Sequence, residues 1–306
     1  MLGSLPKKVR IVEVGPRDGL QNEKTIISLA DKVTFIKMLS EAGLHEIEAN
    51  SFVRAEKIPQ MSDGVELYKS LSHENSLRNT KLISLVPNDK GLENALSSGV
   101  KEIAVFTATS NTFNQKNINA TVDESLKRIE GVMKKANSEG LKTRAYISTV
   151  FGCPYEGKTS LAELKRVAYA LENLGVSEIS LGDTIGIANP QQVQEVITFL
   201  KADFNLDFFA MHFHDTRGMA VANVLASLDM GITSFDSSAG GLGGCPYAKG
   251  ASGNVATEDL VFLFSSMGIE TGIDMDKLAL ASKFILEKLG KTSSSKNLTA
   301  YLASRA

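Results

Sequence analysis

Two histidines spaced two residues apart form the strongest chemical signal in the sequence. They lie in the segment Met211-His212-Phe213-His214-Asp215, at the end of a predicted strand. On a strand, residues i and i+2 face the same side, about 6.5–7 Å apart, so His212 and His214 would project together. Two neutral imidazoles aimed at one point can bind a divalent metal; the alternative is a hydrogen-bonded pair lining a cavity. Because half of the four histidines lie here, the spacing favours a ligand pair.

Two further side chains could supply oxygen ligands to the same metal. Asp18 follows an apolar run, in Gly15-Pro16-Arg17-Asp18-Gly19, and could offer a carboxylate. Asn254 precedes a predicted helix that begins near Val255. Its amide is by default a helix N-cap, and the alternative is a metal ligand. The pattern alone leaves both interpretations of Asn254 open.

Three charged residues could act on a substrate. Arg17 could hold a carboxylate or stabilise an oxyanion, although an arginine beside an aspartate is most often an exposed ion pair. Glu48 stands in an otherwise apolar run and is expensive to bury alone, so it needs a partner such as Arg17. Asp183 could be an acid/base group or a turn-forming residue.

A glycine-rich segment, residues 238–247, carries Cys245. Four glycines in five positions make this segment flexible or strained. It could be a linker, but a reactive side chain on such a loop suggests a lid that closes over a site. The thiol of Cys245 would then act as a proton donor.

The elements that must position these residues alternate between short β-branched runs and helical periodicities. The predicted strands are 9–14, 46–50, 81–86, 101–107, 143–151, 178–181, 208–214 and 233–236. Helix starts are marked by capping residues, namely Ser28, Thr121, Ser160 and Asn189. Parallel strands joined by right-handed crossovers predict an α/β protein of the (β/α)8 TIM-barrel type. The rival is an open doubly wound sheet, but no Gly-x-Gly-x-x-Gly follows the first strand.

The predicted organisation is a single domain over residues 1–306. The barrel occupies about 8–270, and a helical extension of about 271–306 contains an additional C-terminal helix over about 276–289. In such barrels the carboxyl ends of the strands and the loops after them form the active site. The polar residues at the strand ends are therefore expected to meet there.

Composition excludes several classes of protein. The chain has 306 residues, 43% of them apolar, with a formal charge of −2 and a pI of about 6.2, which argues against nucleic acid as the main partner. No run of 18 apolar residues suggests a membrane span. Two cysteines provide no disulfide framework, and the first ten residues lack the apolar stretch of a secretion signal. We therefore expect a cytoplasmic protein.

Several segments together resemble the 3-hydroxy-3-methylglutaryl-coenzyme A (HMG-CoA) lyase family. They are VGPRDGLQNE (14–23), LGDTIG (181–186), HFHDTRG (212–218) and SAGGLGGCPYAKGASGN (238–254). The resemblance implies a catalytic cysteine at Cys245, a catalytic arginine at Arg17 and active-site positions at Glu48 and Asp183. It also implies four metal ligands, at Asp18, His212, His214 and Asn254.

The resemblance further implies an activity. Family members cleave HMG-CoA to acetoacetate and acetyl-CoA, a retro-Claisen step in leucine breakdown and ketone-body formation, with Mg²⁺ or Mn²⁺. We thus expect an acyl-CoA substrate and a homodimer. The general base stays open between Asp18, Asp183 and a water molecule at the metal. The alternatives are a condensing enzyme of the isopropylmalate or homocitrate synthase type, an aldolase acting on a hydroxy-keto acid, and a non-catalytic barrel that binds metal or acyl-CoA.

Overall fold

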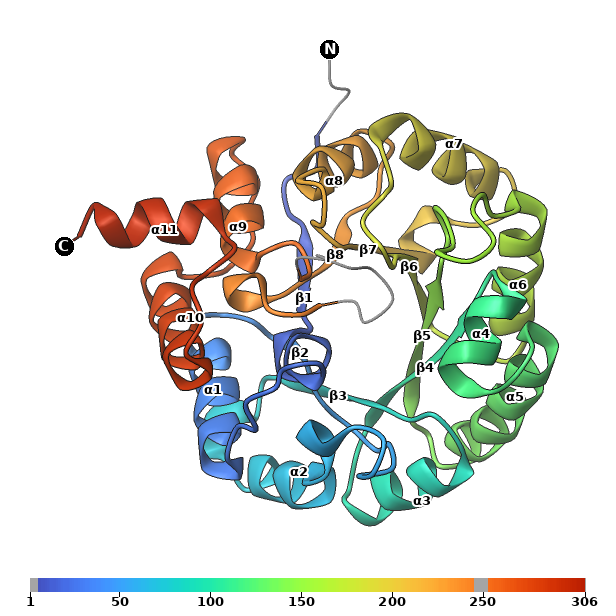
Figure 1. Ribbon diagram of the computed structural model, residues 1–306, viewed down its shortest axis with the longest axis horizontal. Coiled ribbons are helices and arrows are strands. Elements are labelled where there is room, and N and C mark those ends of the chain that lie inside the picture. Colours follow the sequence, from blue (N-terminus) through green and yellow to red (C-terminus); the bar gives the residue numbers. More distant parts are fainter. Residues whose placement is uncertain (1–4, 245–252, 306) are drawn as a thin grey trace.

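Eight parallel strands close into a barrel in chain order, and Figure 1 shows them at the centre of a ring of helices. The computed structural model describes residues 5–244 and 253–305. The strands are β1 (Arg10–Glu13), β2 (Glu46–Ser51), β3 (Lys81–Leu85), β4 (Glu102–Ala108), β5 (Lys142–Ser148), β6 (Glu178–Asp183), β7 (Phe209–Phe213) and β8 (Ser234–Ser237). The predicted TIM-barrel fold is confirmed.

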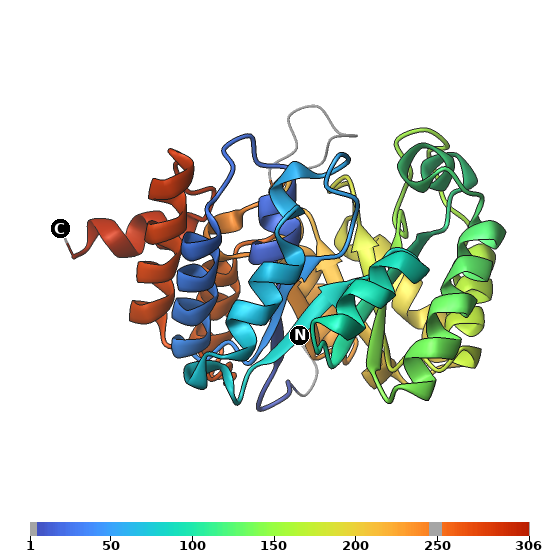
Figure 2. The same cartoon turned by 90° about the horizontal axis from the view of Figure 1, so that it is seen from below.

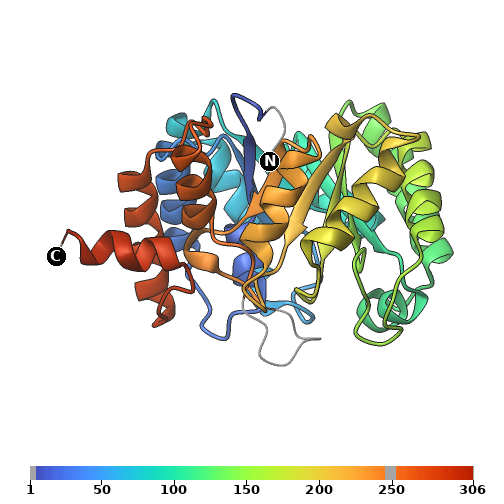
Figure 3. The ribbon, with the colours of Figure 1, turned by 90° about the horizontal axis from the view of Figure 1, so that it is seen from above.

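Helices follow each strand and form the outer wall, which Figures 2 and 3 show from two sides. They are α1 (Leu29–Glu41), α2 (Gly64–Ser72), α3 (Asp89–Ser97), α4 (Asn111–Ile118), α5 (Val122–Ser138), α6 (Leu161–Asn173), α7 (Pro190–Lys201), α8 (Ala220–Asp229) and α9 (Thr257–Ser266). The four predicted capping side chains each accept a hydrogen bond from the backbone N–H three residues later. These bonds satisfy donors that the first helical turn leaves unpaired. None of the helices in the described ranges combines the length and apolar character needed to cross a membrane.

Four strands, β1, β3, β5 and β7, end earlier than the sequence pattern predicts, and two of these ends lie beside the predicted site residues. β5 stops at Ser148 because Thr149 adopts a left-handed conformation, with φ of 60°, and donates its N–H to Oγ1 of Thr184 at 2.8 Å. β7 stops at Phe213, and His214 pairs instead with Asn254 through an isolated antiparallel bridge. The second histidine is thus tied to the segment that carries the amide, which brings two of the predicted ligands together.

The main apolar core lies between the strands and the surrounding helices. Inside the barrel, a smaller apolar cluster occupies one side, made by Val12, Val14, Ile83, Leu85, Ala104 and Tyr146. Charged residues fill other parts of the interior. Arg144 pairs there with Glu178 and Asp236, while Arg10, which is partly exposed at the start of β1, pairs with Glu46. Because an unpaired buried charge is strongly destabilising, these pairs are what allows ionised side chains inside the barrel.

The chain continues past the barrel into two helices, α10 (Met275–Leu289) and α11 (Lys296–Ala303). The helix predicted over 276–289 is α10, which lies beside α1, while α11 contacts α9. The N–H of Asp274 donates to the carbonyl of Ala42 at 2.8 Å, just before Gly43. Gly43 has φ of 96°, and a Cβ there would lie 2.3 Å from the carbonyl oxygen of Gly272. Only glycine fits this junction.

Candidate metal centre and active site

Asp18, His212 and His214 converge at the carboxyl end of the barrel. Oδ2 of Asp18 lies 3.9 Å from Nε2 of each histidine, and the candidate ligand atoms of the three residues all lie within 4.8 Å of one another. The two imidazole rings are 5.3 Å apart, centre to centre. This geometry suits a shared divalent cation, since one nitrogen on each ring and one carboxylate oxygen face a common point.

A tight turn after β1 places Asp18. Residues Gly15–Gly19 form one π-helical turn in which the N–H groups of Arg17, Asp18 and Gly19 approach the carbonyl of Val14 at 2.8–3.2 Å. Gly19 packs so closely that an added Cβ would lie 2.9 Å from both Leu242 and Ser238. The turn therefore depends on its glycine to sit against the segment that follows β8.

Asn254 completes the candidate ligand set. Its Nδ2 donates to Oδ2 of Asp18 at 2.9 Å and to the carbonyl of Leu242 at 3.2 Å. The amide does not cap the next helix, because α9 begins at Thr257 and its N-cap is Ala256. Oδ1 of Asn254 is buried and has no hydrogen-bond partner within the described residues. A buried unsatisfied oxygen is costly, and a cation would satisfy it, so this donor set fits a divalent metal.

Arg17 is fixed beside this centre by two carboxylates. Its Nε donates to Oε2 of Glu48 at 2.7 Å, and its Nη1 donates to Oδ1 of Asp18 at 2.6 Å. The hydroxyl of Tyr146 also donates to Glu48, at 3.0 Å, so the expected Arg17–Glu48 pair is part of a buried network. Burial opposes the charge on Arg17, but Glu48 and Asp18 together hold its pKa above the usual value. The guanidinium stays charged and rigid.

The protonation states of two members of the cluster, His214 and Asp18, favour metal binding at neutral pH. Burial lowers the pKa of His214 to about 4, and the neighbouring His212 adds to the effect. Burial opposes ionisation of Asp18, but Arg17 and the two histidines lower its pKa to about 2. A neutral imidazole and an ionised carboxylate are the forms in which these groups bind metal.

Asp183 ends β6, and its surroundings bear on both interpretations that the sequence left open, a turn-forming residue and an acid/base group. Its carboxylate oxygens accept the N–H groups of Ile187 and Ala188, each at 3.0 Å, and so shape the turn. Burial outweighs these bonds and raises its pKa to about 6. A carboxyl group that titrates near neutrality is suited to acid/base work.

The start of the glycine-rich segment is fixed by two buried carboxyl groups, which bind its backbone N–H groups. Oε1 of Glu13 accepts the N–H of Ala239 at 2.9 Å, and Oε1 of Glu258 accepts that of Gly240, also at 2.9 Å. Both carboxyl groups are fully buried. Cys245, the proton donor expected from the sequence, lies outside the described residues.

Sequence reasoning missed three interior residues that contact the site, namely Arg144, Tyr146 and Asp236. Nδ1 of His212 lies 3.2 Å from Oδ2 of Asp236, which lies directly across from it on β8. Arg144 donates to Asp236 at 2.9 Å and to the hydroxyl of Tyr146 at 3.1 Å. The sequence did carry a signal for Arg144 and Asp236, because each is a charged residue within a predicted strand, as Glu48 is.

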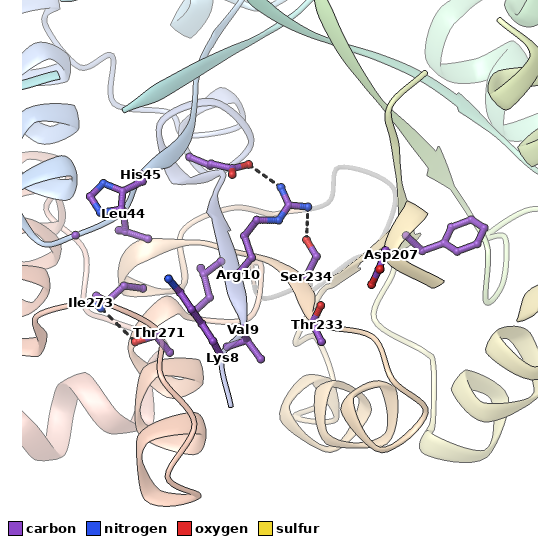
Figure 4. Close-up of a pocket in the computed structure, with 14 residues that line it drawn as sticks. Lys8, Val9, Arg10, Leu44, His45, Asp207, Thr233, Ser234, Thr271 and Ile273 are labelled. Carbon is purple, nitrogen blue, oxygen red and sulfur yellow. Dashed lines mark hydrogen bonds and ion pairs between the residues drawn. The ribbon is translucent and has the colours of Figure 1, made fainter. Parts of the chain in front are cut away.

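A cavity of about 530 Å³ lies at the opposite end of the barrel. Figure 4 shows Arg10 and Ser234 in its wall, where Arg10 donates to Ser234 at 2.7 Å. Its lining residues come from the starts of β1, β2, β7 and β8. This cavity is therefore separate from the candidate metal centre, which follows the strand ends.

A closed parallel barrel with carboxylate, imidazole and amide groups gathered at its carboxyl end places the chain in the class of TIM-barrel proteins with a candidate metal site at the strand ends. The chain belongs to the HMGL-like family, whose model matches residues 8–285. It is 50% identical to a hydroxymethylglutaryl-CoA lyase of Bacillus subtilis, over 98% of this chain and 99% of that protein. It is also 48% identical to the mitochondrial hydroxymethylglutaryl-CoA lyase of Rattus norvegicus, over 96% of this chain and 90% of that protein.

A solved structure is similar as well. It is an HMG-CoA lyase from Acinetobacter baumannii in complex with coenzyme A and 3-methylmalate, with a TM-score of 0.91 and 35% identity, covering 98% of this chain and 97% of that one. The family resemblance read from the motifs is confirmed, and the chain is a carbon–carbon lyase.

Proposed function

We propose that the chain cleaves HMG-CoA to acetoacetate and acetyl-CoA with Mg²⁺ or Mn²⁺. The observation that carries this proposal is the convergence of Asp18, His212 and His214, with the unsatisfied oxygen of Asn254, beside the fixed guanidinium of Arg17. Full-length similarity to hydroxymethylglutaryl-CoA lyases supports the substrate, as does the coenzyme A bound in a similar structure.

The four candidate ligands would hold the ion through oxygen and imidazole nitrogen, a set that Mg²⁺ or Mn²⁺ accepts when water or substrate completes the coordination. When bound, a divalent cation neutralises a substrate carboxylate and lowers the pKa of a nearby hydroxyl group. Arg17 and Asn254 keep the carboxylate of Asp18 in place through the contacts described above.

The first chemical step removes the proton of the tertiary hydroxyl group. Asp183 suits this role better than Asp18, because its pKa is about 6 whereas that of Asp18 is about 2. As the proton leaves, the bond between carbons 2 and 3 of the substrate breaks. Carbon 3 becomes the ketone of acetoacetate, and the electron pair passes to the carbon next to the thioester.

Arg17 would stabilise the oxyanion that this electron pair creates. A guanidinium has five N–H donors, and those directed at Glu48 and Asp18 leave others for a ligand. Cys245 would then protonate the carbon and yield acetyl-CoA. Glu48 acts as the positioning residue for Arg17.

Removal of the metal provides the first test of this proposal. We expect exhaustive chelation to abolish acetoacetate formation from HMG-CoA, and Mg²⁺ or Mn²⁺ to restore it. Other 3-hydroxyacyl-CoAs, and acetyl-CoA with keto acids, are assayed in parallel to distinguish a related lyase or a condensing enzyme. Full turnover by the metal-free protein would contradict the metal-dependent mechanism.

The proton donor provides the second test. Cys245→Ala should slow turnover strongly while leaving substrate affinity nearly unchanged, because the thiol acts after the substrate has bound. The matched control is Cys153→Ala, which removes the chain's other thiol, a buried group 3.1 Å from the hydroxyl of Ser110. An unchanged rate in Cys245→Ala would assign the proton to another group.

The proposal includes a cytoplasmic location and a homodimer. The first is supported by the scarcity of cysteine in a chain of this length. Analytical sedimentation of the purified protein at several concentrations would show whether it forms a homodimer.

A further inference from the structure

His212 is held between two carboxylates, one on each ring nitrogen. Nε2 faces Oδ2 of Asp18 at 3.9 Å, whereas Nδ1 lies 3.2 Å from Oδ2 of Asp236. His212 and Asp236 are register partners on β7 and β8, so the backbone itself sets them side by side. We propose that Asp236 is a positioning residue that fixes the tautomer and orientation of His212 as a metal ligand. This inference rests on the metal centre of the proposed function.

The partners of Asp236 determine which ring nitrogen carries the proton. Its side chain is fully buried, Oδ1 accepts from Arg144 at 2.9 Å, and Oδ2 accepts from the hydroxyl of Ser180 at 2.7 Å. An ionised carboxylate has no proton to give, so Nδ1 of His212 must donate. In the neutral ring, Nε2 then keeps its lone pair, and this is the nitrogen that faces Asp18.

Arg144 keeps Asp236 ionised. The guanidinium lies between Asp236 and Glu178, 2.8 Å from the latter, and its side chain is only 5% exposed. With Oδ1 accepting from this guanidinium and Oδ2 accepting from the hydroxyl of Ser180, both carboxylate oxygens of Asp236 act as acceptors, as an ionised carboxylate does. Arg144 therefore supports the ligand through the carboxylate.

His214 lacks this kind of support. Its Nδ1 is buried and has no hydrogen-bond partner within residues 5–244 and 253–305. The two imidazoles are thus unequal: His212 is oriented and made more basic by an anion, and His214 is held by its backbone bridge to Asn254. A carboxylate on the far nitrogen of a ligand histidine typically contributes 10- to 100-fold in metal affinity.

A purely structural ion pair between Asp236 and Arg144 is the alternative, and metal affinity separates the two roles. We would titrate Mn²⁺ into the metal-free wild type, Asp236→Asn and Glu178→Gln by calorimetry. Glu178→Gln is the matched control, because it neutralises the other carboxylate of Arg144, one contact further from His212. We expect Mn²⁺ to bind about 10- to 100-fold more weakly to Asp236→Asn and unchanged to Glu178→Gln. Wild-type affinity in Asp236→Asn would overturn the proposal.

The tautomer gives a second readout that requires neither turnover nor a folded variant. Nitrogen NMR of the metal-free wild type, at a pH where the imidazole is neutral, should show His212 protonated on Nδ1. Protonation on Nε2 would overturn the proposal even if Asp236→Asn fails to fold. If the wild type bound no Mn²⁺, the proposed metal centre itself would be refuted. If the wild type and Asp236→Asn bound Mn²⁺ with equal affinity, only the role of Asp236 would be refuted.

Discussion

At the scale of single residues, the site combines groups whose charges depend on one another. Arg17 binds Glu48 and Asp18, and Asp18 in turn accepts from Asn254 and faces both histidines. Removing one member leaves its neighbour buried and unpaired, which is costly in both stability and geometry. The effects of single substitutions here will therefore exceed the loss of one contact.

Arg17 offers the most direct test at this scale. We expect Arg17→Gln to lower kcat by about 10²–10³-fold, the usual loss when one oxyanion donor is removed. Steady-state kinetics with HMG-CoA measures the change, and thermal unfolding checks that the variant is folded. Arg166→Gln on α6 is the control, because that arginine is 47% exposed and forms only surface ion pairs. A folded Arg17→Gln with a normal kcat would exclude the oxyanion role.

At the scale of elements, two buried carboxyl groups hold the start of the glycine-rich segment. Glu13 joins β1 to Ala239 and to the hydroxyl of Thr257, at 2.9 and 2.6 Å. Glu258, on α9, accepts hydrogen bonds from the backbone N–H of Gly240 and from the hydroxyl of Ser282 on α10. Burial raises the pKa of both carboxyl groups to about 7, against the hydrogen bonds that they accept.

These raised pKa values predict a pH dependence of stability. In the folded protein Glu258 stays protonated up to about pH 7, whereas in the unfolded chain it ionises near its ordinary 4.5. Its contribution is thus fully present below pH 4.5 and is lost as pH rises to 7, because the native state binds the extra proton. The loss is on the order of 3 kcal/mol for a shift of this size.

The measurement compares Glu258→Gln with the wild type by thermal unfolding at several pH values between 4.5 and 7.5. The Tm of the variant should rise relative to that of the wild type over this window, since the amide does not titrate. Parallel curves for the two proteins would show that Glu258 has an ordinary pKa.

Element boundaries also show what the sequence could and could not predict. Capping side chains such as Thr121 and β-branched runs predicted the strands and helices, because both signals are local. The ends of β5 and β7 were predicted too long, because Thr149 bonds to Thr184 and His214 pairs with Asn254, contacts that depend on distant residues. For the site, the spacing of His212 and His214 favoured a ligand pair, and the full set of four ligands was implied only by the family resemblance.

The network behind the ligands could not be predicted in the same way. Asp236 contacts His212 only because β7 and β8 pair in one register, and periodicity does not specify register in a strand buried on both faces. Arg144 reaches the same carboxylate across the interior of the barrel, from β5. Such contacts form only when the eight strands close into a barrel.

At the scale of the whole molecule, the C-terminal extension meets the barrel wall at a close backbone junction, in addition to its contacts with α1 and α9. Gly43 follows α1 and touches the backbone at Gly272, just before α10. α10 then lies along α1, with Leu278 and Ile285 fully buried. The position of α10 therefore depends on a residue without a side chain at this point.

Gly43→Ala tests the junction. The substitution adds a Cβ 2.3 Å from a carbonyl oxygen and also strains a positive φ, so we expect it to lower the free energy of unfolding by well over 1 kcal/mol. Gly99→Ala is the matched control, with φ of 84° and no atom near the added Cβ, and should cost only about 1 kcal/mol. Denaturant unfolding measures both. Equal losses would show that the contact with Gly272 yields readily.

The positions of the ligands along the chain have a consequence for biosynthesis. Asp18 follows the first strand, His212 lies in the seventh and His214 just after it, and Asn254 follows the eighth. While the chain is being synthesised, Asp18 is therefore the only one of the four proposed ligands present until the seventh strand has been made. In the proposed metal centre, the full set of ligands can assemble only after β1 has paired with β8, and a bound cation would then link the two ends of the chain across this pair of strands.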